Sequence, residues 1–158
     1  MAQLYQQLIL DHSRRPHGKG LVEGFDGESF QVNPTCGDQV RLRVELADGA
    51  TRLGAVNWDG QGCSISQASI SVMTDLVTGL PLAEVAALEA AFGELMHSRG
   101  KGVDDAVADA LGDAIAFEGV SQYPMRVKCA LLGWMALKDA VAKAAAGDNS
   151  PAHVPEGI

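Results

Sequence analysis

Three cysteines and one aspartate supply the most reactive side chains of this sequence: Cys36, Asp38, Cys63 and Cys129. A cysteine thiolate is both a soft metal ligand and a nucleophile. Three thiolates and one carboxylate form a ligand set that suits tetrahedral zinc. Taken singly, each cysteine could also be a small buried apolar side chain, so the local sequence has to decide between the two interpretations.

Cys36 lies in the segment 33–38 (Asn-Pro-Thr-Cys-Gly-Asp), whose Pro, Gly and Asn predict a loop rather than a core segment. Asp38 follows two residues later. In an extended chain, residues two apart point to the same side, so a thiolate and a carboxylate could reach one metal ion. Alternatively, the Asp38 carboxylate could hold the loop by accepting hydrogen bonds from backbone N–H groups.

Cys63 lies in the segment 60–66 (Gly-Gln-Gly-Cys-Ser-Ile-Ser), where a strand pattern gives way to a helix pattern. The N–H groups and the dipole at a helix start favour a thiolate there. The two glycines do not form a dinucleotide-binding loop, because Ile65 replaces the third glycine, and no phosphate-binding lysine follows.

Cys129 follows Arg126 and Lys128, and these two cations would lower the pKa of its thiol. They are also placed to offset the negative charge of a zinc ion with four anionic ligands. The alternative is that the cations are solvated and Cys129 belongs to the core, because Met125 and Leu132 share its helix face. We interpret the four histidines (His12, His17, His97 and His153) as surface or structural residues, with His12 the one nearest to an ordered element.

The elements that must position these residues come in the order of strands first and helices later. A helix is predicted from apolar spacing at residues 4–9, ending near 14–18. Strands are predicted near residues 30–32, at 40–46, where apolar and polar residues alternate, and at 51–58, with a turn at Asp48-Gly49 between the last two. Helices are predicted at 63–79, 81–95 and 103–115 and from Pro124 onward.

This order predicts an α+β fold, with a small antiparallel three-stranded sheet and helices packed on it. We expect one domain over residues 1–146 and a disordered tail over residues 147–158, which have two prolines and no periodicity.

Composition narrows the function classes. The chain has 158 residues, of which 47 % are hydrophobic. Its net charge of −8 argues against nucleic acid or an anionic membrane as the main partner. No segment reaches the roughly 18 apolar residues of a membrane span. Three cysteines without a secretory signal indicate reduced thiols in the cytoplasm.

The segments 33–38, 60–69 and 126–134, together with the first helix, resemble the SufU branch of the IscU/NifU N-terminal family over nearly the whole chain except the tail. Scaffold-type IscU proteins carry histidine directly before the last cysteine, where this chain has Lys128. The stretch from about residue 96 to residue 117 resembles the extra segment of the SufU branch.

The resemblance implies a zinc-dependent sulfur acceptor for iron–sulfur cluster assembly, with a SufS-type pyridoxal-phosphate cysteine desulfurase as its partner and a downstream cluster-assembly complex as a further candidate. It also implies that Cys36 receives the sulfur and that Arg126 assists near the metal. Two alternatives stay open: a scaffold that transiently binds an iron–sulfur cluster, and a protein whose metal only stabilises the fold.

Overall fold

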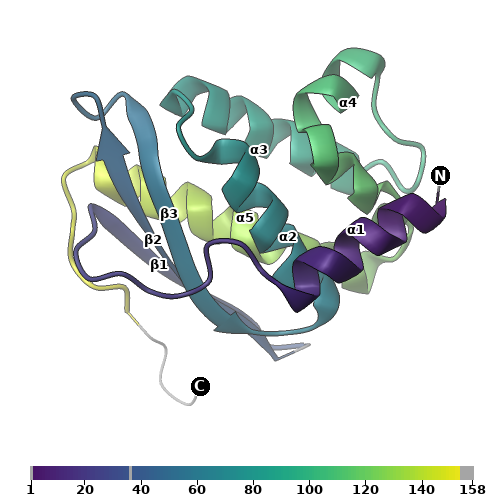
Figure 1. Ribbon diagram of the computed structural model, residues 1–158, viewed down its shortest axis with the longest axis horizontal. Helices are drawn as coiled ribbons and strands as arrows, with labels where there is room; N and C mark the ends of the chain where they lie inside the picture. The colour runs from purple at the N-terminus through teal and green to yellow at the C-terminus, as the bar shows by residue number, and fades with distance from the viewer. Residues whose placement is uncertain (1, 36, 154–158) are drawn as a thin grey trace.

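The computed structural model describes residues 2–35 and 37–153, and within them three strands form one antiparallel sheet. The strands β1 (Gly27–Asn33), β2 (Asp38–Ala47) and β3 (Arg52–Gln61) lie side by side in this order. The helices are α1 (Ala2–Arg14), α2 (Ser64–Val77), α3 (Leu82–Met96), α4 (Asp105–Leu111), the 3-10 helix η1 (Gly112–Gln122) and α5 (Pro124–Ala145). Figure 1 shows the helices gathered on one side of the sheet, which confirms the predicted α+β fold.

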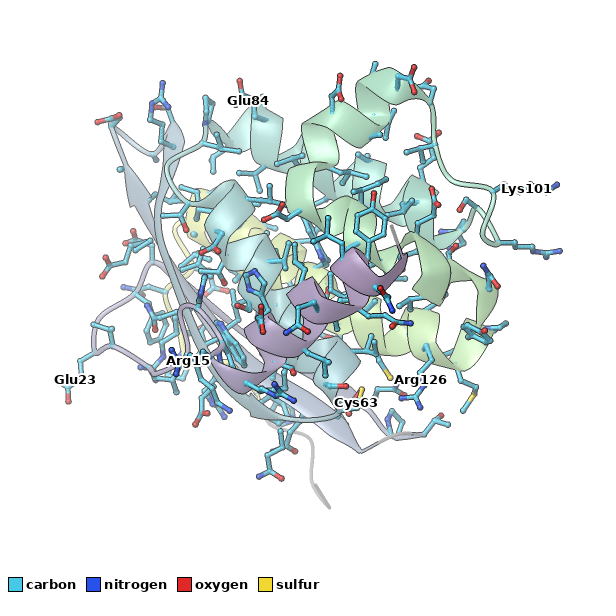
Figure 2. The ribbon with its side chains drawn as sticks, turned by 45° about the vertical axis from the view of Figure 1, so that its right-hand side comes forward. Arg15, Glu23, Cys63, Glu84, Lys101 and Arg126 are labelled. Atoms are coloured by element: carbon cyan, nitrogen blue, oxygen red, sulfur yellow. The ribbon has the colours of Figure 1, made fainter. Side chains whose placement is uncertain are left out.

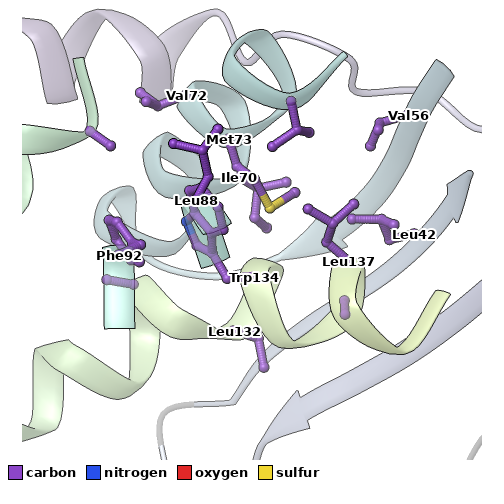
Figure 3. Close-up of a cluster of buried hydrophobic side chains, with 14 of the residues drawn as sticks. Leu42, Val56, Ile70, Val72, Met73, Leu88, Phe92, Leu132, Trp134 and Leu137 are labelled. Atoms are coloured by element: carbon purple, nitrogen blue, oxygen red, sulfur yellow. The ribbon is translucent and has the colours of Figure 1, made fainter. Parts of the chain in front are cut away.

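The central strand β2 separates the core from the outer face of the sheet. Val40, Leu42 and Val44 are fully buried on the helix side, as the alternation of the sequence predicts. Arg41 and Arg43 point to the other face. Figure 3 shows how side chains from the strands, α2, α3 and α5 meet in one hydrophobic core.

Helix α5 packs along β1 and β2, and α2 packs between α5 and α1. The contact between α2 and α5 is very close at Gly133, where a Cβ atom would lie 2.3 Å from Cγ1 of Ile70. A residue with a side chain at this position would therefore push the two helices apart. None of the described helices is long and apolar enough to cross a membrane.

The helix predicted at 103–115 is two elements, because Gly112 has a φ of 51° and ends α4. The chain continues as η1, which buries Phe117 edge-on against Phe92, with 6.0 Å between the ring centroids. The segment 96–117 thus adds a short helix and part of a 3-10 helix beside α3. Sequence periodicity cannot separate these elements, since their apolar spacing continues through the glycine.

Glu28 on β1 connects the outer face of the sheet to the segment after α5. Its carboxylate accepts hydrogen bonds from Arg41 at 2.9 Å, from Arg43, and from the Ala152 N–H at 2.9 Å. Burial by itself raises the pKa of Glu28, but the hydrogen bonds from Arg43 and Ala152 and the charges of both arginines bring the pKa below its ordinary value. The predicted disorder of residues 147–158 stays a prediction, since residues 154–158 lie outside the described part of the chain.

We expect Glu28→Gln to lower the free energy of unfolding at neutral pH by about 1–3 kcal/mol, because charge-assisted hydrogen bonds are lost. A carboxyl with a lowered folded-state pKa stabilises the protein above its unfolded-state pKa and loses this effect as pH falls through the folded-state pKa. The difference between wild type and variant should therefore shrink in acid. Urea unfolding at stepwise lower pH measures it, with the exposed Glu23→Gln as control. An equal difference at every pH would contradict this account.

Candidate metal centre

Asp38, Cys63 and Cys129 come from three different elements and meet at one end of the molecule. Asp38 is the first residue of β2, Cys63 directly precedes α2, and Cys129 lies in the second turn of α5. One ligand atom from each residue lies within 4.8 Å of the other two. Figure 2 shows Cys63 and Arg126 close together at this end.

Asp38 is almost completely buried and holds the start of α2 in place. Its Oδ1 accepts a hydrogen bond from the Cys63 N–H at 3.1 Å, and its Oδ2 lies 3.9 Å from the Cys63 Sγ. Gly62 is required for this approach, because a Cβ atom there would lie 2.7 Å from the Asp38 Oδ1. The carboxylate thus makes the backbone contact that one sequence interpretation expects, while its second oxygen faces a thiol.

Cys129 is buried, with its Sγ 3.6 Å from the Met125 carbonyl oxygen, yet it also lines an open cavity of about 520 Å³. The cavity is further lined by Gly37, Asp38, Gln61, Gly62, Cys63, Met125 and Arg126. Arg126 therefore stands at the cavity, whereas Lys128 is exposed and is not among the residues that line it. Both sequence interpretations of Cys129 therefore hold in part: the residue is buried, as a core residue would be, and it also lines the cavity of the candidate site.

Cys36 lies outside the described residues. Its neighbour Gly37 has a φ of 74° and lines the cavity beside Asp38. Of the four predicted ligands the structure thus brings together three, and the roles of Cys36 as ligand and sulfur acceptor stay predictions.

The donor set fits a zinc ion. Zinc binds thiolate at about 2.3 Å and carboxylate at about 2.0–2.2 Å in tetrahedral geometry. Neighbouring ligands of such an ion are therefore separated by about 3.5–3.8 Å. The separations of 4.8 Å or less between the three described residues need only small side-chain adjustments to reach these values.

A second cluster of side chains that could hold a metal ion was not predicted from the sequence. It contains His12 on α1, His17 in the loop that follows α1, and Asp75 on α2, which is far from both histidines in the sequence. Burial and the neighbouring His17 lower the pKa of His12. The other two histidines are exposed, and Nδ1 of His97 lies 2.7 Å from the Gly93 carbonyl at the end of α3.

The fold and the cysteine cluster define a family of domains. Residues 4–130 match the model of the NifU-like N-terminal domain, and the chain belongs to this family. It is 41 % identical over 148 residues to the zinc-dependent sulfurtransferase SufU of Bacillus subtilis, with 92 % of this chain and 94 % of the relative covered. It is 36 % identical over 155 residues to the iron–sulfur cluster assembly scaffold protein IscU of Streptococcus pyogenes, with 98 % and 93 % covered.

Solved structures show the same fold. A candidate iron–sulfur cluster assembly scaffold protein for the SUF system from Fervidobacterium islandicum aligns with a TM-score of 0.76 at 34 % identity, covering 88 % of this chain and 97 % of that structure. The N-terminal part of a NifU-like protein from Brucella abortus aligns with a TM-score of 0.77 at 23 % identity, covering 89 % and 93 %. The resemblance inferred from the three cysteine segments is thereby confirmed.

We expect Cys63→Ser and Cys129→Ser each to lose bound zinc, because each removes one thiolate from a site built on rigid elements. Zinc content after dialysis against a chelator measures the effect. Met125→Leu, which changes a cavity residue without removing a predicted ligand, is the matched control and should keep its zinc. Full zinc retention in both serine variants would show that the metal binds elsewhere.

Two substitutions separate the roles of Asp38. Asp38→Asn keeps an oxygen that accepts from the Cys63 N–H but lacks the carboxylate charge, whereas Asp38→Ala removes both. We expect both variants to release zinc to a chelator faster than wild type, and only Asp38→Ala to lose about 1–2 kcal/mol of folding stability as well. Wild-type zinc release by Asp38→Asn would assign the carboxylate to the backbone contact alone.

Proposed function

We propose that this protein is a zinc-dependent sulfur acceptor that takes persulfide sulfur from a pyridoxal-phosphate cysteine desulfurase in the cytoplasm and passes it on for iron–sulfur cluster assembly. The observation that carries the proposal is the cluster of Asp38, Cys63 and Cys129 in an open cavity. It is further supported by the 41 % identity to a protein named as a zinc-dependent sulfurtransferase.

Cys36 is the residue best suited to accept sulfur. Cys63 directly precedes α2 and Cys129 lies within α5, so movement of either thiol would disturb packed helices. Cys36 precedes Gly37, which lines the cavity, and follows a loop sequence in which movement disturbs little packing. Zinc, when bound, holds its cysteine ligands as thiolates.

The transfer step balances without an external oxidant or reductant. The Cys36 thiolate attacks the outer sulfur of the desulfurase persulfide, and its electron pair forms the new S–S bond. The pair of the original S–S bond leaves with the desulfurase cysteine as a thiolate. Arg126, at the cavity wall, is placed to compensate for the negative charge that both thiolates bring to the site.

Exposed apolar side chains beside the cavity support docking of a partner protein. Tyr123 is 60 % exposed and Met125 is 53 % exposed, and both line a second hollow with Pro124 and Arg126. Apolar and aromatic residues next to an arginine are typical of protein interfaces.

A scaffold that carries an iron–sulfur cluster is the second candidate, because relatives named as scaffold proteins are 30–36 % identical to this chain. The lysine at position 128 favours the sulfur acceptor, since by the resemblance scaffold-type IscU proteins carry a histidine directly before the last cysteine, and Lys128 is exposed. Metal analysis of the protein purified without added metal separates the candidates. Colourless protein with about one zinc per chain supports the acceptor, and brown protein with iron and sulfide supports the scaffold.

We expect sulfur from the desulfurase to appear first on Cys36. Incubation with desulfurase and cysteine, alkylation without reductant and mass spectrometry locate the added sulfur. Cys36→Asp introduces a carboxylate that can bind zinc but has no sulfur to accept the transfer, so the variant should hold metal and accept no sulfur. Sulfur found first on Cys129, or normal acceptance by Cys36→Asp, would overturn the assignment.

A further inference from the structure

We propose that His12, His17 and Asp75 form a second metal site, which binds zinc or a similar divalent first-row ion at the opposite end of α2 from the cysteine cluster. One ligand atom of each residue lies within 4.8 Å of the other two. His12 belongs to the last turn of α1, His17 to the following loop, and Asp75 to the last turn of α2.

The backbone of His17 is fixed on both sides. Its N–H donates to the Ser71 Oγ at 2.7 Å, and its carbonyl accepts from the Trp58 Nε1 at 2.9 Å. The next residue, Gly18, lies so close to α2 that a Cβ atom would be 2.7 Å from the Thr74 Cγ2. The loop is therefore seated on α2, and the His17 ring is held over Asp75 before any ion binds.

His12 is oriented by the same serine. Its Nδ1 lies 2.6 Å from the Ser71 Oγ, and Ser71 precedes Asp75 by four residues, one turn of α2. Metal-binding histidines commonly have a hydrogen-bond partner on one ring nitrogen, which fixes the ring and leaves the other nitrogen for the ion, and the Ser71 hydroxyl can serve in this way.

The rings of His12 and His17 lie 4.7 Å apart at 55°, and Nδ1 of His17 lies 2.6 Å from the Asp75 Oδ2. Without an ion this short contact is a hydrogen-bonded pair, and a bound zinc ion would replace the shared proton and hold the two atoms about 3.3 Å apart. Two adjacent imidazoles repel each other when both are protonated, whereas one dication uses a lone pair from each ring and the carboxylate together.

The donor set identifies the class of ion. Two imidazole nitrogens and one carboxylate oxygen suit zinc and its neighbours, and they leave coordination positions for water. Calcium and magnesium prefer oxygen ligands alone. The side chains of His17 and Asp75 are 52 % and 51 % exposed, so the ion can enter from solvent.

The two sites are separate. Cys63 precedes α2 and Asp75 lies twelve residues later, which at 1.5 Å per residue is about 18 Å along the helix. Figure 2 likewise separates Arg15, which lies between the two histidines in sequence, from Cys63. The proposed site therefore does not depend on the function proposed for the cysteine cluster.

Cobalt distinguishes the sites by their ligands. Full-length protein is first loaded with one equivalent of zinc and then titrated with Co²⁺ while its absorption is recorded. We expect one further equivalent of cobalt to bind, with ligand-field bands but without the thiolate-to-cobalt charge-transfer band that cysteine ligands produce.

His17→Asn and Asp75→Asn should each weaken this second equivalent at least about tenfold. The matched control is His153→Asn, which changes an exposed histidine outside the cluster and should bind as wild type. Cys63→Ser, titrated with Co²⁺ without prior zinc loading, should lose the cysteine site and still bind one equivalent without a charge-transfer band, so failure of either proposal is recognised separately. Excess zinc should also raise the Tm of wild type, and should do so much less in Asp75→Asn, because an ion that binds only the folded state stabilises it.

Three results would overturn the proposal. They are binding of no further cobalt by wild type, unchanged binding by Asp75→Asn, and a charge-transfer band that accompanies the second equivalent. His17, Asp75 and His153 are exposed and Cys63 is half-buried, and circular dichroism of each variant verifies that the fold is kept.

Discussion

The close crossing of α2 and α5 is the constraint on which the cysteine cluster depends. Gly133 lets the Ile70 side chain fill the space where a Cβ atom would otherwise stand, and the Ser69 hydroxyl donates to the Ala130 carbonyl at 2.6 Å across the same contact. One turn before Gly133, Cys129 lies with its Sγ within 4.8 Å of the Sγ of Cys63, the residue that directly precedes α2. If a further side chain separated the helices, Cys63 and Cys129 could not both reach one zinc ion at the zinc–sulfur distance of about 2.3 Å, as the proposed site requires.

The sheet completes the cluster from the other side. β2 begins at Asp38, opposite Asn33 on β1, and pairing of Gln39 with Gln61 places the end of β3 beside it. Since β3 leads directly into α2, the carboxylate and Cys63 come together through strand register. The proposed ligand set is arranged by register and helix packing, so its three described members are close together without an ion, which reduces the ordering that binding would require.

Much of the fold follows from local sequence, and the exceptions have physical causes. The alternation at 40–46 identifies β2, because one face of the strand is buried, and the three cysteine segments identify the family. The end of α4 at Gly112 depends on a positive φ that periodicity does not reveal. The His12, His17 and Asp75 cluster was missed because it depends on a loop seated on a distant helix, which spacing along the chain cannot show. The roles of Cys36 stay predictions.

Asp38 also limits how the sequence can vary over time. A thiolate or an imidazole at this position would be a good zinc ligand, but neither has two equivalent oxygens, one for the proposed ion and one for the Cys63 N–H. An aspartate-to-cysteine change would therefore strengthen one proposed bond to zinc while leaving the Cys63 N–H, directly before α2, without its acceptor. The hydrogen bond from the Cys63 N–H therefore disfavours replacement of Asp38 by cysteine, although the metal itself would accept a fourth thiolate. The carboxylate can persist even where stronger zinc binding would be advantageous.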